Sequence, residues 1–239
     1  MSLARLVPWT APNNGVSRAR TDGGRVVVLA GPSGAGKSRL AARLHAAYGW
    51  PVVRLDDFYR DGDDPELPTR DLGGTTIVDW DDPGSWNAAA AVRALEDLVA
   101  AGTTEVPVYD IARSAAAGTA RISAPPGSLV VAEGIFAAEI IGALADAGIL
   151  HSAWCVRHPR WVTFGRRLVR DLAERRKAPL VLLRRGLALT RAEPEVVARM
   201  ERLGATCAGP AEVERRLRTA RPSTNQTSTN SHTRERGSG

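Results

Sequence analysis

The sequence is poor in cysteine and in long apolar runs, and each shortage excludes a class of protein. The two cysteines, Cys155 and Cys207, are too few and too widely spaced for a disulfide framework or a metal-ligand motif. We therefore expect both to be small buried apolar side chains. No apolar run approaches the roughly 20 residues that a membrane-spanning helix needs. The first 24 residues lack the apolar core of a signal peptide, so we expect a cytoplasmic protein that does not bind a membrane.

Lysine is also scarce, since Lys37 and Lys177 are the only two in the sequence. The chain has 32 Lys and Arg against 26 Asp and Glu, which gives a net charge of +6. The positive charge is concentrated between residues 157 and 202, where 13 Arg and Lys accompany 5 Asp and Glu. Such a surplus suits an anionic ligand, and nucleotide phosphates and nucleic acid are both candidates. The only aromatic residues among the arginines are Trp161 and Phe164, and no recognition motif is present. Nucleic acid is therefore not the expected partner.

The composition of the two ends indicates where the ordered domain lies. Residues 1–24 show little apolar periodicity and predict a flexible leader, whereas residues 221–239 are polar and predict a disordered tail. The intervening residues 25–220 are enough for one domain with a sizeable core. The sequence favours no particular oligomeric state.

Apolar runs alternate with helical patterns along this domain. Short, continuously apolar strands that alternate with helices predict a parallel sheet covered on both faces, so we expect a three-layer α/β fold. From residue 159 onward, arginine-rich helices are expected to dominate. The predicted strands are 25–30, 51–56, 106–110, 128–134 and 149–156, and the predicted helices are the segment ending near Tyr48, 83–102 and 136–148.

Residues 31–38, GPSGAGKS, match the pattern G-x-x-x-x-G-K-[ST] between a predicted strand and a predicted helix. Glycines let backbone N–H groups converge on a phosphate, and the following helix adds the positive end of its dipole. We predict that Lys37 reaches the β- and γ-phosphates of ATP and that the Ser38 hydroxyl binds Mg²⁺. The predicted nucleotide-binding residues of this motif are Gly31, Ser33, Gly34, Ala35, Gly36, Lys37, Ser38 and Arg39.

Carboxylates stand at the C-terminal ends of two other predicted strands. Asp56 and Asp57 close one of these strands, and Glu133 follows four apolar positions of the other. In a doubly wound sheet, the carboxyl ends of the strands face the ligand, so these acids are expected beside the phosphate loop. An acid there can accept a proton from an attacking hydroxyl or help to hold Mg²⁺. Asp81 suits a polyhydroxylated substrate, because a carboxylate accepts paired hydrogen bonds from neighbouring hydroxyls.

The motifs of this chain, in their order, resemble those of the uridine kinase family, within the uridine kinase and phosphoribulokinase group of P-loop kinases. The resemblance extends over about residues 26–177 and rests on six stretches in sequence: GPSGAGKS, DDFY, DWDDP, PVYD, AEGIF and RRLVRDLAERR. It implies a P-loop NTPase fold with an arginine-rich helical lid over about residues 158–185. It also implies ATP and Mg²⁺ as the cofactors.

The resemblance implies individual roles at the matching positions. Asp56 would be the general base for the hydroxyl of the acceptor, and Ser38, Asp56 and Glu133 would form the magnesium site. The substrate residues would be Asp81, Tyr109, Asp110 and Tyr59. Arg166 and Arg170 would act with Lys37 in catalysis, and Arg167 would contact the nucleotide. The spacing supports this cluster independently, because residues four apart share one face of a helix.

We therefore expect an ATP-dependent phosphotransferase that acts on a hydroxyl of a small molecule, with a nucleoside as the leading candidate. Within the same class, a pantothenate-like compound or a sugar phosphate is the main alternative acceptor. A different class, a nucleotide-binding switch or regulator, would share the phosphate loop. Hydrolysis of ATP without an acceptor would distinguish the switch from the kinase.

Overall fold

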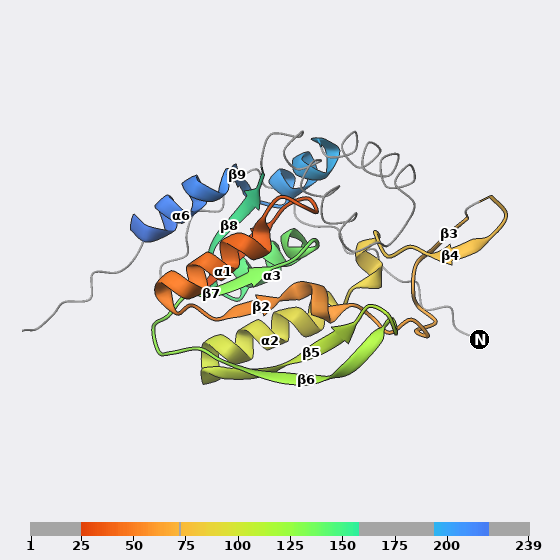
Figure 1. Ribbon diagram of the computed structural model, residues 1–239, viewed down its shortest axis with the longest axis horizontal. Helices are drawn as coiled ribbons and strands as arrows, with labels where there is room; N and C mark the ends of the chain where they lie inside the picture. Colours follow the sequence, from red (N-terminus) through yellow and green to blue (C-terminus); the bar gives the residue numbers. More distant parts are fainter. Residues whose placement is uncertain (1–24, 72, 158–193, 220–239) are drawn as a thin grey trace, which may run out of the picture.

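The computed structural model describes residues 25–71, 73–157 and 194–219, and a five-stranded parallel sheet forms its centre (Figure 1). Neighbouring strands in the order β2-β7-β1-β8-β9 are all parallel. The prediction of an α/β fold with a central parallel sheet is therefore confirmed. The strands are β1 (Val26–Ala30), β2 (Val52–Arg54), β7 (Val130–Glu133), β8 (Leu150–Val156) and β9 (Thr206–Ala208).

The sheet is covered by helices on both faces, and β1 contributes to both cores. Successive side chains of β1 point to opposite faces of the sheet. Val26 and Val28 therefore belong to one apolar cluster, and Val27 and Leu29 belong to the other. The first cluster includes residues of α2 (Ala88–Ala101) and α3 (Ile141–Asp146), and the second includes residues of α1 (Lys37–Tyr48) and α6 (Pro210–Thr219). All five residues of β1 are fully buried, as expected for the middle strand of a three-layer fold.

The predicted helix over 83–102 begins later than the sequence indicated. Residues Pro83–Ser85 form a separate 3₁₀ turn, η2, and α2 starts only at Ala88. The Asn87 side chain accepts a hydrogen bond from the backbone N–H of Ala90 at 3.0 Å, so this residue caps the helix. The predicted end at Gly102 is confirmed, since that glycine adopts the left-handed conformation after the last turn.

The strand predicted at 106–110 exists, but it does not join the parallel sheet. It is part of β5 (Thr103–Asp110), which pairs antiparallel with β6 (Ala115–Ser123) in a two-stranded hairpin beside α2 (Figure 1). Thr104 and Val106 are buried while their neighbours are more exposed, so β5 buries only one face. That alternation is typical of an antiparallel strand with one solvated face. A second hairpin, β3 (Thr69–Asp71) with β4 (Thr76–Val78), was not predicted.

The other predicted elements are confirmed with shorter bounds. The strand predicted over 51–56 ends at Arg54, where the 3₁₀ turn η1 (Leu55–Phe58) begins. The helix predicted over 136–148 is divided into the 3₁₀ turn η3 (Ala137–Ile140) and α3. Cys155 and Cys207 are register partners on β8 and β9, and both are free thiols.

Three predicted segments lie outside the described residues: the leader over 1–24, the lid over about 158–185 and the tail over 221–239. Within the ranges that the structure describes, no helix combines the length and apolar character needed to cross a bilayer.

Candidate active site

The loop between β1 and α1 depends on glycines for its backbone conformation. Gly31 has φ of 146°, and a Cβ at this position would clash with the carbonyl oxygen of Val156. Gly36, with φ of 90°, directly precedes the first residue of α1. The first turn of α1 contains no acidic residue, so the N–H groups at this end of the helix face no competing carboxylate of that turn. The sequence Gly31–Ser38 therefore forms the type of loop that the motif predicted.

The buried side chain of Lys37 folds back over this loop. Its Nζ donates to the carbonyl oxygens of Gly31 at 2.8 Å and Pro32 at 3.3 Å. The ammonium group is thus held against two carbonyl groups of the loop. Arg39, the other cation of the motif, is exposed on α1.

The residues predicted to hold a metal ion meet at the C-terminal ends of the strands. The Ser38 hydroxyl donates to Oε2 of Glu133 at 3.2 Å. Glu133 ends β7 and is only 5% exposed, and this burial raises the pKa of its carboxyl, while nearby Lys37 lowers it. A hydroxyl beside a desolvated carboxylate fits Mg²⁺, which prefers oxygen ligands.

Asp56 joins this group from η1. Its Oδ1 accepts a hydrogen bond from the backbone N–H of Ile135 at 2.9 Å, two residues after Glu133. Gly134 permits this approach, because a Cβ there would lie 2.8 Å from Asp56 Oδ1 and 2.8 Å from the Cβ of Leu55. The structure therefore brings Ser38, Asp56 and Glu133 together. In the described part of the chain, no group of three His, Cys, Asp or Glu side chains is arranged as a metal site, so a bound Mg²⁺ would take further ligands from phosphate and water.

The turn that carries Asp56 is fixed by the segment before α2. The indole Nε1 of Trp86 donates to the carbonyl oxygen of Leu55 at 2.6 Å. The backbone N–H of Asn87 donates to Phe58 O at 2.9 Å. The position of Asp56 thus depends on residues about thirty positions further along the chain. Sequence reasoning missed Trp86 and Gly134, whose only signals are a tryptophan and a glycine next to motif residues.

Tyr59, which directly follows η1, occupies the centre of an aromatic group. Its ring centroid lies 5.8 Å from those of Trp80 and Tyr109 and 5.9 Å from that of Phe136. Its hydroxyl donates to the carbonyl oxygen of Trp80 at 3.3 Å. Burial raises the pKa of the Tyr59 phenol far above its usual value, and the carboxylates of Asp56 and Asp81 raise it further. Tyr59 is therefore close to both of these predicted residues.

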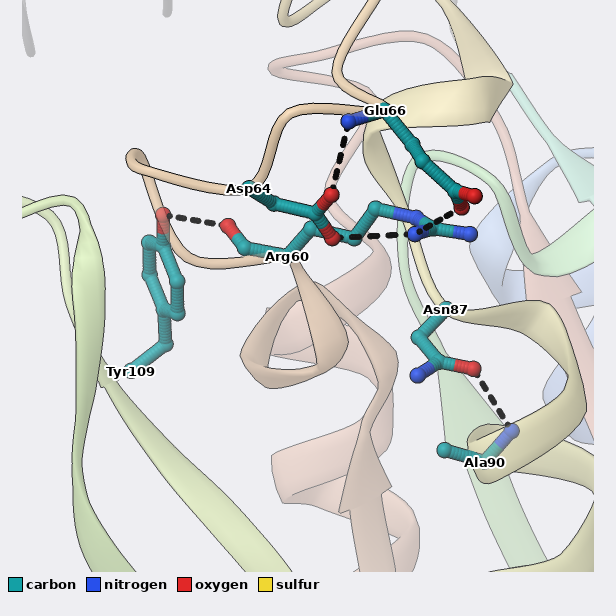
Figure 2. A network of polar contacts seen from close by, with 6 residues as sticks. All are labelled: Arg60, Asp64, Glu66, Asn87, Ala90 and Tyr109. Carbon is teal, nitrogen blue, oxygen red and sulfur yellow. Dashed lines mark hydrogen bonds and ion pairs between the residues drawn. The ribbon is translucent and has the colours of Figure 1, made fainter.

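Tyr109 connects the tip of the β5–β6 hairpin to the chain that follows η1. Figure 2 shows its hydroxyl donating to the carbonyl oxygen of Arg60, at 3.1 Å. Two further bonds join the same segments: Gly62 N–H donates to Ser114 O at 2.6 Å, and the backbone N–H of Ala116 donates to Asp61 Oδ1 at 2.8 Å. The hairpin is thereby clamped onto the residues that follow Asp56 and Tyr59.

The other predicted substrate residues have different surroundings. Asp81 is exposed and forms an ion pair with Arg70 at 3.9 Å. Asp110 uses Oδ1 to accept a hydrogen bond from Ala112 N–H at 2.8 Å, so its carboxylate supports the turn of the hairpin. The predicted lid arginines Arg166, Arg167 and Arg170 lie outside the described residues.

Two arginines in the segment that follows Asp56 were also missed by the sequence reasoning. Arg60 Nη1 donates to Asp64 at 2.9 Å and to Glu66 at 3.2 Å, as Figure 2 shows. Arg70 of β3 pairs with Asp79 at 3.2 Å. The signal in the sequence is weak, because arginines scattered in an aspartate-rich loop are normally exposed surface residues.

Comparison with known proteins identifies the family of the chain. The model of the family described as "Phosphoribulokinase / Uridine kinase family" matches residues 26–179. The inorganic pyrophosphatase TTM2 of Arabidopsis thaliana is 33% identical over 121 residues, which are 49% of this chain and 16% of that protein. The uridine kinase of Saccharomyces cerevisiae is 28% identical over 136 residues, which are 55% of this chain and 24% of that protein. The chain therefore spans only a small part of the length of either relative.

A solved structure from Silicibacter sp. TM1040, described as a fructose transport system kinase, has the same fold. It superposes with a TM-score of 0.51 at 21% identity and covers 80% of this chain and 90% of its own. The match of the family model takes in the phosphate loop, Asp56, the aromatic group and Glu133. The chain therefore belongs to the phosphoribulokinase / uridine kinase family.

Proposed function

We propose that this protein transfers the γ-phosphoryl group of ATP to a hydroxyl of a small molecule. The observation that carries the proposal is the meeting of three oxygen-bearing side chains at the start of α1. Ser38 bonds to Glu133, and Asp56 bonds to the backbone two residues beyond Glu133. These groups lie beside a loop in which Gly31, Gly34 and Gly36 have positive φ, a backbone conformation that suits the binding of a phosphate.

The loop and Lys37 would bind the triphosphate. The Lys37 ammonium would exchange its two carbonyl contacts within the loop for phosphate oxygens, where its charge opposes that of the transferred group. Ser38, Asp56 and Glu133 would hold Mg²⁺. The ion, when bound, supplies positive charge that neutralises the phosphates. Binding in this loop fixes the terminal phosphate relative to Asp56, and such positioning supplies much of the acceleration in phosphoryl transfer.

Asp56 would act as the general base. Its carboxylate is exposed, while the Ile135 N–H fixes one of its oxygens. The other oxygen can accept the proton of the acceptor hydroxyl as that oxygen attacks the γ-phosphorus. The new P–O bond forms as the bond to the β–γ bridging oxygen breaks, which leaves ADP and the phosphorylated acceptor. Lid arginines at 166, 167 and 170 would stabilise the charge of the transferred group.

The acceptor would lie against Tyr59 and Tyr109, with Asp81 binding its hydroxyls. A flat apolar group packs well on aromatic rings, and a carboxylate accepts bonds from neighbouring hydroxyls, so a nucleoside combines the two features that this side offers. A pantothenate-like compound or a sugar phosphate is the alternative acceptor in the same reaction.

The test is an ADP-release screen over nucleosides, pantothenate and sugar phosphates, run with the full chain, ATP and Mg²⁺. The proposal predicts slow ADP release without an acceptor and a large increase with one class of acceptor. ADP release that is the same with and without every acceptor contradicts it and favours a nucleotide-binding switch.

Asp81→Ala tests the acceptor side separately. We expect KM for the acceptor to rise at least about tenfold, because a carboxylate that binds hydroxyls is lost, while KM for ATP stays the same. A variant that raises KM for ATP and leaves the acceptor KM unchanged would remove Asp81 from the acceptor site.

A further inference from the structure

The charge of the acceptor side is unlike that of the rest of the protein. Residues 54–82 contain ten Asp and Glu and three Arg, a net charge of −7, although the whole chain carries +6. These residues include Asp56, Tyr59 and Asp81, to which we assign acceptor binding and proton abstraction. The inference below rests on that proposed function, because it concerns the acceptor of the same site.

The cations of this region are already paired with carboxylates. Each of its arginines, and the one at the hairpin tip, has a carboxylate oxygen within 4 Å. The pairs are Arg54–Asp57 at 3.8 Å, Arg60–Asp64 at 2.9 Å, Arg70–Asp79 at 3.2 Å and Arg113–Asp110 at 3.4 Å. An anionic acceptor would have to compete with these internal partners for each guanidinium.

Two of the arginines are paired twice. Arg60 also contacts Glu66 at 3.2 Å, and Arg70 also contacts Asp81 at 3.9 Å. Among the side chains that form these ion pairs, the carboxylates therefore outnumber the guanidiniums. Burial raises the pKa of the Tyr59 phenol, and two carboxylates of the region, Asp56 and Asp81, raise it further.

The aromatic rings around Tyr59 act in the same direction as the carboxylates. The faces of Tyr, Trp and Phe rings carry partial negative charge and attract a cation within about 6 Å of the ring centroid. Tyr59, Trp80 and Tyr109 are partly exposed, and the ring centroids of Trp80 and Tyr109 each lie 5.8 Å from that of Tyr59. Aromatic faces combined with an excess of carboxylates over guanidiniums attract a positive group and repel a negative one.

We propose that the acceptor side selects its substrate by charge: an amine-bearing, cationic hydroxyl compound is preferred to the neutral compound of the same shape, and the anionic compound is rejected. The selection comes from the carboxylates and aromatic rings around Tyr59. Carboxylated and phosphorylated acceptors are thereby excluded in favour of uncharged and cationic ones.

The experiment measures kcat/KM by ADP release for two matched series with the full chain. One series is glycerate, glycerol and 3-aminopropane-1,2-diol, and the other is 5-carboxymethyluridine, 5-methyluridine and 5-aminomethyluridine. Further pairs are pantothenate with panthenol, and ribulose 5-phosphate with ribulose. We expect kcat/KM to rise from anion to neutral compound to cation, by at least about tenfold between the extremes, and to differ less at 0.5 M NaCl because salt screens exposed charges.

The outcomes separate this inference from the proposed function. If an anionic member has the highest kcat/KM of its series, the inference is wrong and the kinase assignment stands. If no compound in the whole panel increases ADP release, the proposed function fails and the inference fails with it.

Two variants test whether the named carboxylates create the selection. Asp79→Asn removes the nearer partner of Arg70, and Asp57→Asn removes the partner of Arg54, so each should raise kcat/KM for the anionic member relative to the cationic one by about threefold or more. Glu214→Gln is the matched control, because it removes the same charge from an ion pair with Arg43 between α6 and α1. A shift in the Glu214→Gln control as large as that in both test variants would overturn the inference.

Discussion

The proposed phosphate side of this protein, around residues 31–38 and Glu133, and its proposed acceptor side, around Tyr59, Arg70 and Asp81, are built in different ways. The phosphate side consists of backbone groups and a few buried side chains: Lys37 and Glu133 are 8% and 5% exposed. The acceptor side consists of turns and hairpins whose exposed side chains, such as Arg70 and Asp81, form ion pairs with one another. A site made from buried backbone is rigid and serves one ligand, whereas a site made from surface side chains can change its specificity by substitution.

The difference has a consequence for mutations. Changes on the phosphate side should impair transfer of phosphate to every acceptor, because they alter the geometry around Asp56 or the metal site. Changes on the acceptor side should mainly alter which acceptor is used. The following experiments test this division.

The largest effect is expected for Asp56→Asn. Loss of the general base should lower kcat by about 10²–10⁴-fold, whereas ATP binding should persist because the loop over 31–38 is intact. Steady-state kinetics measures kcat, and titration with a fluorescent ATP analogue measures ATP binding. The Asp57→Asn neighbour is the matched control and should retain most of the wild-type kcat; an equal loss in both variants would show that Asp56 has no special role.

Gly134→Ala should have the next largest effect. The new Cβ would lie 2.8 Å from Asp56 Oδ1 and from the Cβ of Leu55, so η1 must move. We expect the free energy of unfolding to fall by about 1–3 kcal/mol and kcat to fall by about 10²-fold through displacement of the base. Gly209→Ala is the control, because a Cβ there meets no atom within 4 Å. A Gly134→Ala protein with wild-type kcat for every acceptor would contradict the geometry described for Asp56.

Glu133→Gln should separate stability from function. Burial raises the pKa of Glu133, so its ionised form destabilises the fold at neutral pH, and removal of the charge should raise Tm of the ligand-free protein. The gain should disappear as the pH falls through the raised pKa, because the wild-type side chain then becomes neutral. Thermal unfolding at pH 7 and pH 4 measures the difference in Tm between the variant and the wild type. A difference that grows toward low pH would contradict the prediction. Activity should drop, since the amide replaces a carboxylate at the metal site.

Tyr109→Phe should have the smallest effect and the most selective one. The variant loses the hydrogen bond from the Tyr109 hydroxyl to Arg60 O, which costs about 1 kcal/mol in unfolding free energy. We expect KM for the acceptor to rise severalfold and KM for ATP to stay constant, as initial-rate kinetics would show. An increase in KM for ATP alone would mean that the hairpin does not belong to the acceptor side.

The phosphate side was easier to predict from the sequence than the acceptor side. The motif GPSGAGKS and the strand before it predicted the conformation around Gly31 and Gly36, because local glycine chemistry determines that turn. The meeting of Ser38 with Glu133 was also predictable, since the loop before Ser38 follows β1 and Glu133 ends β7, the parallel strand beside β1.

The acceptor side was predicted only in part. Motifs suggested its candidate residues, whose roles stay a prediction. However, β5 was expected in the parallel sheet, and the clamp between Tyr109 and Arg60 had no signal in the sequence. The bond from Trp86 to Leu55 that positions Asp56 was equally invisible, because it joins residues 31 positions apart. Contacts of this kind depend on tertiary packing and not on local pattern.

The most direct test of the account is a structure of the full chain with Mg²⁺ and a non-hydrolysable ATP analogue. The account predicts a triphosphate enclosed by residues 31–38, Mg²⁺ beside Ser38 and Glu133, and a carboxylate oxygen of Asp56 facing the terminal phosphate. A nucleotide bound elsewhere, or an Asp56 side chain that points away from the metal and the γ-phosphate, would contradict it.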